Sequence, residues 1–141
     1  MFLLIPAMPA ETNLDRLLLT MQPVLAAGEY MFSTLPPGAR VPAGLTPIAT
    51  FREVEGLTLI LPSAEAVAAA LPVSYPCRLI TLNVHSSLEA VGFLARISAH
   101  LAAHGLPVNA VAGYFHDHLF VPAARAEEAL ALLQELTSKA G

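Results

Sequence analysis

The sequence predicts an α+β fold in which two imperfect copies of a split βαβ unit form antiparallel sheets with helices on one face. Two observations predict it. Short apolar runs of strand length alternate with longer runs that have a helical period. The element order (α)-β-loop-β-β-α in residues 12–76 is similar to the order β-α-β-β-α in residues 77–141. The chain therefore divides into a leader or extra strand at residues 1–11 and these two halves.

Composition limits the classes of function. The chain has 141 residues, of which 55% are hydrophobic and 13% charged, so we expect apolar surface to be shared in a homodimer or larger assembly. A net charge of −4 and seven scattered Lys and Arg argue against a nucleic-acid partner. The single cysteine, Cys77, cannot form an intrachain disulfide, which favours a cytoplasmic location.

The first ten residues, MFLLIPAMPA, have the apolar character of a signal peptide without its organisation. No basic residue precedes the apolar run, and Pro6 interrupts it. A misassigned start or an extra edge strand is therefore favoured over a signal or anchor. No other apolar run approaches the roughly 20 residues of a membrane-spanning helix, so no membrane partner is expected.

The first half is predicted to open with a short helix. Thr12 can cap this helix, Asp15 can complete a capping box, and Pro23 marks a break in the helical run. Residues 29–35 have the character of a strand, and residues 36–47 form a loop rich in proline and glycine.

A hairpin and a second helix complete the first half. The alternating runs 49–54 and 57–61 flank Glu55-Gly56, as a tight turn requires. Ser63 is then placed to cap a short helix that ends before Pro72.

The second half contains the clearest helix of the chain, predicted from Ser86 or Ser87 to Ala103. Ser86 and Glu89 have the spacing of a capping box, and Gly105 is placed as a C-terminal stop. The other predicted elements of this half are strands at 78–84, 106–113 and 118–122 and a final helix at 123–140. We expect the strand 78–84 to lie centrally in its sheet, beside the strand 118–122.

The strand count is incomplete. Two ferredoxin-like βαββαβ units need eight strands, whereas the periodicity supports six. The last helix runs nearly to residue 141, so no closing strand can follow it. We therefore expect that a strand is lent between the halves or that one sheet is short.

The stretch VHSSLEAVGFLARISAHLAAHGLPVNAVAGYFHDHLFVP resembles the ACT domain, a regulatory module that binds small molecules. The recurring pattern is a strand, a capped helix, A-x-x-G, a strand carrying N-V, and a hairpin. The chain is also similar to tandem ACT-like proteins of bacteria, through GEYMFSTLP, SSLEAVG and AGYFHDHLFVP. This resemblance covers about nine-tenths of the chain and not its leader. It implies a tandem ACT-like fold, an amino-acid ligand near the turn before the helix, and an interface between modules.

The candidate ligand site is the turn that leads into the predicted helix. Free N–H groups at a helix N-terminus suit a carboxylate, and Ser86 and Ser87 could add hydrogen bonds. Asp117, or carbonyl groups near Asn109, could accept a bond from an amino group. The predicted ligand-binding residues are His85, Ser86, Ser87, Leu88, Asn109, Ala110, Val111, Tyr114, His116 and Asp117.

Two other readings of these residues are weaker. His116 and His118 lie on one face of a strand, but zinc needs at least one further ligand, so no metal site is predicted. His85 beside Ser86 and Ser87 does not have the geometry of a nucleophile and base, so no catalytic residue is predicted.

The sequence therefore predicts a regulatory module without catalytic activity or cofactor. It would bind a small molecule, an amino acid in the first place, and act on a partner protein. The alternative is a structural or protein-interaction unit whose ligand site is vestigial.

Overall fold

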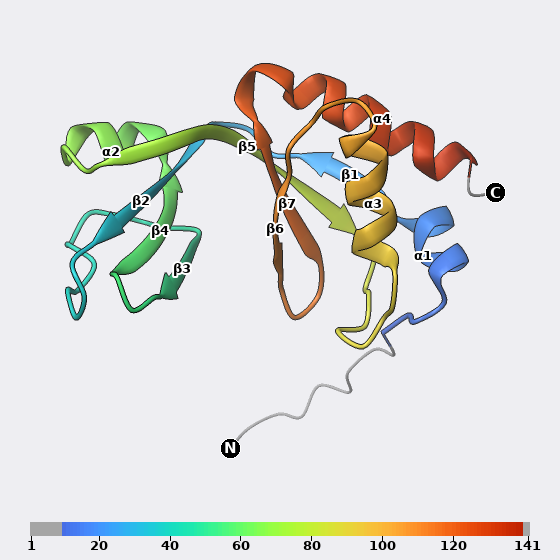
Figure 1. The fold of residues 1–141 in the computed structure, drawn as a ribbon, viewed down its shortest axis with the longest axis horizontal. Coiled ribbons are helices and arrows are strands. Elements are labelled where there is room, and N and C mark those ends of the chain that lie inside the picture. The colour runs from blue at the N-terminus through green and yellow to red at the C-terminus, as the bar shows by residue number, and fades with distance from the viewer. Residues whose placement is uncertain (1–9, 140–141) are drawn as a thin grey trace.

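The chain folds into one antiparallel sheet with helices packed against it, which confirms the α+β prediction. The computed structural model describes residues 10–139, so nearly all of the leader predicted at residues 1–11 lies outside the described residues. Within residues 10–139, seven strands form a single sheet. In chain order the elements are α1 (Leu14–Thr20), β1 (Gln22–Leu25), β2 (Tyr30–Leu35), β3 (Ala49–Arg52), β4 (Leu57–Pro62), α2 (Ser63–Ala68), β5 (Val73–Asn83), α3 (Phe93–Ala102), β6 (Asn109–Ala112), β7 (Asp117–Pro122), the 3₁₀ turn η1 (Ala123–Arg125) and α4 (Ala126–Lys139) (Figure 1).

Strand β5 is used by both halves. Its first residues pair with β2, with Val73 opposite Ser33 and Cys77 opposite Tyr30. Its later residues pair with β7 on one side and with β1 on the other. The boundary proposed between residues 76 and 77 therefore falls inside a continuous strand.

Each half thereby has four strands in the same spatial order. The order is β3-β4-β2-β5 in the first half and β6-β7-β5-β1 in the second. The expectation that a strand is lent between the halves is confirmed, because β5 is the last strand of the first half in chain order and also the first strand of the second half. The central position of residues 78–84 beside β7 is also confirmed. Strand β1, which the sequence did not predict, supplies the last strand of the second half from the N-terminal side.

A β-bulge at Tyr75 separates the two parts of β5. The register with β2 shifts between Tyr30 and Phe32, and Tyr75 has a positive φ of 60°. Such a backbone conformation costs of order 1–3 kcal/mol for a non-glycine residue, so its surroundings must hold it. The Tyr75 hydroxyl donates to the carbonyl of Phe120 at 2.9 Å. Because bulges bend and twist a strand, this one lets β5 pass from one half to the other.

The apolar core has three parts. On the helix side of the second half, α1, α3 and α4 cover β5 and β7 around Leu18, Ile80, Ile97, Leu119 and Leu133. On the helix side of the first half, a smaller cluster contains Leu35, Leu59, Leu61 and Ala66. On the opposite, helix-free face lie Ile60, Cys77, Leu79 and Phe120. This third cluster joins residues of β4, β5 and β7, so it couples the two halves.

Two predicted helix caps are wrong. Helix α1 begins at Leu14, and the side chain of Asn13, not of Thr12, accepts a hydrogen bond from Arg16 N–H at 3.0 Å. Helix α2 begins at Ser63 itself, so this hydroxyl does not cap it, and it has no hydrogen-bond partner in the described part of the chain. Asparagine and threonine are both good N-caps, so residue type alone did not decide the first position.

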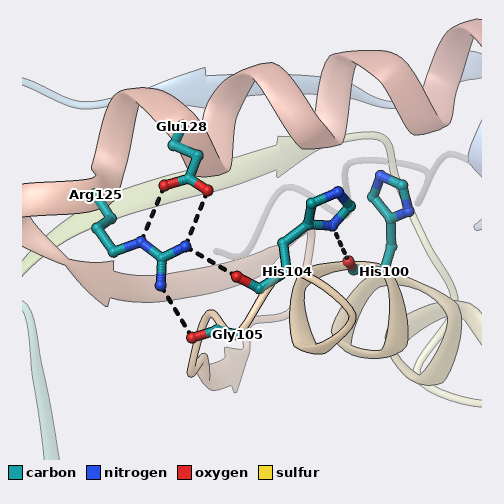
Figure 2. Close-up of polar contacts among 5 residues, drawn as sticks. All are labelled: His100, His104, Gly105, Arg125 and Glu128. Carbon is teal, nitrogen blue, oxygen red and sulfur yellow. Dashed lines mark hydrogen bonds and ion pairs between the residues drawn. The ribbon is translucent and has the colours of Figure 1, made fainter.

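Arg125 fastens the end of α3 to the start of α4 (Figure 2). Its guanidinium donates to the carbonyls of His104 at 2.9 Å and Gly105 at 3.0 Å, and it makes two bonds of 2.9 Å to Glu128. The hydrogen bond from Arg125 lowers the pKa of the Glu128 carboxyl. The carbonyls that follow a helix lack intrahelical partners, so Arg125 satisfies them and fixes the chain before β6.

Candidate functional site

Helix α3 begins at Phe93, well after the start predicted at Ser86. Its N-cap is Gly92, which has a positive φ of 91° and provides no side-chain cap. The predicted capping box of Ser86 and Glu89 is therefore wrong. A glycine inside a helical pattern is a poor helix former, and here it marks the true beginning of the helix.

The segment that precedes α1 holds the turn after β5 in an extended form. Glu11 N–H donates to the His85 carbonyl, and Ser87 N–H donates to the Glu11 carbonyl, each at 2.8 Å. The Ser87 hydroxyl accepts a bond from Glu89 N–H at 3.0 Å. These contacts explain why the helix does not start here: the turn bonds to a distant strand segment that sequence periodicity could not reveal.

Two further contacts tie this turn to the hairpin between β6 and β7. The hydroxyl of Ser86, which is buried, donates to Asp117 Oδ2 at 3.1 Å. The ring of His116 donates through Nδ1 to the Val84 carbonyl at 3.1 Å. The structure thus brings together the predicted residues of the turn and those at the start of β7.

A hollow of about 90 Å³ lies between the turn and the hairpin. It also borders the start of α3, whose first intrahelical bond runs from Arg96 N–H to the Gly92 carbonyl. The N–H groups that precede Arg96 in the helix have no intrahelical acceptor and favour negative charge. The hollow is lined by Ser86, Ser87, Leu88, Ala90, Phe93, Leu94, Ala112 and Asp117.

Six of the ten predicted residues lie at or beside this hollow, and four lie elsewhere. Ser86, Ser87, Leu88 and Asp117 line it, and His85 and His116 adjoin it. The other four are on the edge strand β6, with Asn109 at the end away from Ala112, and at the exposed tip of the hairpin: Asn109, Ala110, Val111 and Tyr114.

Four residues that line the hollow were not predicted from the sequence. They are Ala90, Phe93, Leu94 and Ala112. The signal for Phe93 and Leu94 was Gly92, since the first residues after an N-cap carry the free N–H groups. Ala112 is directly opposite Asp117 in the β6–β7 ladder, which only the strand register reveals.

His118 lies on the helix-free face, away from Asp117. Its Nδ1 is 3.0 Å from the Thr81 hydroxyl, and its ring borders a small cavity of about 120 Å³ beside Leu79 and Phe120. Burial lowers the pKa of His118 below its usual 6.5, and the nearby His116 acts in the same direction.

Acidification is expected to destabilise the folded protein through His118. Because the folded-state pKa is lowered, the unfolded state takes up the proton first, so this stability is present above pH 6.5 and is lost as the pH falls toward the folded pKa. Urea unfolding from about pH 8 to about pH 5 should show a smaller loss in His118→Gln than in the wild type. The exposed His104 provides the control His104→Gln. Equal losses in His118→Gln and the wild type would contradict this.

Cys77 is fully buried. Burial, with a smaller contribution from Glu29, raises the pKa of its thiol to about 11, so the thiolate is scarce at neutral pH.

Across residues 10–139, no three His, Cys, Asp or Glu side chains gather as metal ligands. The helices in this same range are all too short or too polar to cross a lipid bilayer.

Two family models, both of the ACT domain, match the chain in tandem, one over residues 9–78 and the other over residues 74–135. Both include residues 74–78, which lie in β5. No functionally curated protein matches the chain significantly.

Solved structures support the same fold. A Vibrio cholerae protein of unknown function, described as a possible transport protein, is 48% identical with a TM-score of 0.80, over 88% of this chain and 95% of that chain. A protein from Agrobacterium tumefaciens is 17% identical with a TM-score of 0.70, over 83% and 89%. The regulatory subunit of aspartate kinase from Thermus thermophilus, in a ligand-free form, is 12% identical with a TM-score of 0.59, over 84% and 97%.

Proposed function

Because the chain belongs to the ACT-domain family, we propose that it is a regulatory module without catalytic activity that binds a free amino acid. ACT domains are regulatory modules for small molecules. The fold shared with an aspartate kinase regulatory subunit supports a regulatory role. We further propose that it acts on a partner protein in the cytoplasm, where the single buried thiol stays reduced.

One observation carries this proposal: the same hollow offers a partner for the carboxylate and a partner for the ammonium group of an amino acid. The N-terminus of α3 attracts a carboxylate, and Asp117 attracts an ammonium group. Ser87 also lines the hollow, and its hydroxyl, which accepts a bond from Glu89 N–H, can donate to a carboxylate. A zwitterion satisfies this arrangement better than a molecule with a single charge.

The size of the hollow and the apolar side chains around it support the proposal that a second copy of the chain packs over it. Its volume of about 90 Å³ is small beside the roughly 300–1,000 Å³ of ordinary ligand sites. Large apolar side chains lie exposed around it: Leu88, Val91, Leu94, Tyr114 and Phe115. A homodimer or larger assembly would bury this surface and complete the site.

Asp117→Asn is expected to weaken amino-acid binding by about 1.5–3 kcal/mol. The substitution keeps the size of the side chain and removes the charge that holds the ammonium group. A thermal-shift screen of the common amino acids first identifies the ligand, because a specific ligand raises the melting temperature. Calorimetric titration then compares its affinity for wild type and variant.

Asp15→Asn is the matched control, since Asp15 is exposed in the first turn of α1 and does not line the hollow. It should leave the affinity unchanged. Equal affinities for wild type and Asp117→Asn would place the ligand elsewhere. A flat thermal response to every amino acid would favour the alternative, a structural or protein-interaction unit with a vestigial site.

A further inference from the structure

Two histidines spaced by four residues lie at the end of α3. His100 is in the last turn of the helix, and His104 follows one turn later. The chain keeps turning past Ala102, because Ala103 N–H donates to the Ala99 carbonyl at 3.0 Å. Side chains four residues apart lie on the same face of such a turn. The two imidazole rings accordingly lie side by side, edge to face, with 5.5 Å between their centroids (Figure 2).

One hydrogen bond fixes the tautomer of His104. Its Nδ1 is 3.1 Å from the His100 carbonyl oxygen. Because a carbonyl only accepts, the proton is on Nδ1, and the neutral ring has its lone pair on Nε2. Histidines that bind metals usually donate the other ring N–H to a carbonyl or a carboxylate in this way. His104 is exposed, so an ion in solution can reach its ring.

The other ring has a nitrogen without a partner. His100 Nε2 is buried and makes no hydrogen bond with any residue between 10 and 139. A role of the pair in capping the helix end explains the bond of His104 Nδ1. It does not explain the His100 atom, since buried polar atoms of this kind are normally bonded to protein, water or an ion.

We propose that His100 and His104 together bind a divalent transition-metal ion, Cu²⁺ in the first place. Small rotations of the two rings bring one nitrogen of each to a shared ion, at the usual metal–imidazole distance of about 2.0 Å. Water completes the coordination. Two imidazole nitrogens with water suit tetragonal Cu²⁺ or Ni²⁺, whereas a closed zinc site needs four protein ligands. Among the divalent ions of the first transition row, Cu²⁺ binds such ligands most tightly.

The surroundings of the pair accept a cation. The C-terminal end of a helix has a partial negative charge. The nearest cation, Arg125, makes two hydrogen bonds to the Glu128 carboxylate, so these two charges balance each other. The two histidines come together only when the end of α3 is folded. The bound ion therefore stabilises the folded protein.

Paramagnetic broadening locates the ion, because Cu²⁺ broadens the amide signals of residues close to it. The full chain, free of any affinity tag and labelled with ¹⁵N, is titrated with sub-stoichiometric CuCl₂. The signals of Ala99, Leu101 and Gly105 should broaden first. The other three histidines are His85, His116 and His118. Broadening centred on these three, or on any other part of the chain, would overturn the proposal.

Moving one histidine along the chain tests whether the two rings share the ion. His104→Ala should weaken Cu²⁺ binding, measured by calorimetric titration, about tenfold or more. Ala103→His added to His104→Ala restores a pair spaced by three, on one face of the turn, and should recover tight binding. Ala102→His added to His104→Ala has the same number of histidines at a spacing of two, where side chains do not face each other, and should not.

The relocated histidines form a matched pair, because Ala102 and Ala103 are both exposed. Equal Cu²⁺ affinities for these two double variants, or an unchanged affinity for His104→Ala, would show that the rings do not act together. Circular dichroism of each variant confirms that it is folded.

Discussion

Phe120→Ala is expected to lower the free energy of unfolding by about 3–5 kcal/mol, the usual cost of removing a buried phenylalanine ring. Phe120 is 2% exposed and lies in the cluster on the helix-free face. Its ring makes edge-on contacts with Tyr30 and Phe32, at centroid distances of 6.2 Å and 5.8 Å. Phe120 belongs to the second half, and Tyr30 and Phe32 belong to the first. The loss in the free energy of unfolding therefore includes the contacts that hold the two halves together. Urea denaturation monitored by circular dichroism measures it.

Phe51→Ala is the matched control for this experiment. Phe51 is 71% exposed on the edge strand β3, so the same chemical change should alter stability by no more than about 0.5 kcal/mol. A loss for Phe120→Ala as small as that for Phe51→Ala would mean that the helix-free cluster contributes little.

Removal of residues 1–28 is expected to unfold the second half. This change deletes α1 and β1 and leaves β5 without its partner beside Ile80 and Leu82. It also removes three side chains that are at most 1% exposed: Leu17, Leu18 and Met21. Each such burial is worth about 1.5–3 kcal/mol, so together they are comparable with the whole stability of a domain. Loss of dispersed amide signals from β6, β7 and α4 would report the unfolding.

A chain that begins at Ala10 is the control for the deletion. It keeps Glu11, whose backbone bonds hold the turn at His85 and Ser87. It should unfold cooperatively, with the β6 and β7 signals in place. If the chain that lacks residues 1–28 also retained those signals, β1 would be dispensable and the second half would hold together with three strands.

The sequence predicted most elements of the fold because their periods are strong. The hairpins β3–β4 and β6–β7 and the helix α4 carry local patterns that need no distant partner. Strand β1 was not predicted because it has only four residues, Pro23 among them, and shows no recognisable alternation of apolar and polar residues. The need for a further strand was indicated only by the eight strands that two βαββαβ units require.

The candidate site could be predicted only in part. Asp117 and Ser86 were placed together through the order of turn and hairpin, which the sequence contains. The predicted start of α3 was wrong because the backbone hydrogen bond that keeps Ser87 out of a helix is made to Glu11, which is far away in the chain. The absence of a helix over β3 and β4 was predicted, since residues 36–47 have the proline- and glycine-rich character of a loop.

The position of β1 in the sheet has a consequence for synthesis of the protein. Gln22 pairs with Asn83, so the strand leaves the ribosome long before its partner exists. Contacts between residues so far apart are slow to form, because a long loop must close first. The first half can assemble once the opening residues of β5 emerge, whereas the apolar side of α1 is not fully covered until α4 is complete. We therefore expect the nascent chain to expose Leu17 and Leu18 for most of its translation, which makes it a substrate for chaperones that bind unfinished proteins.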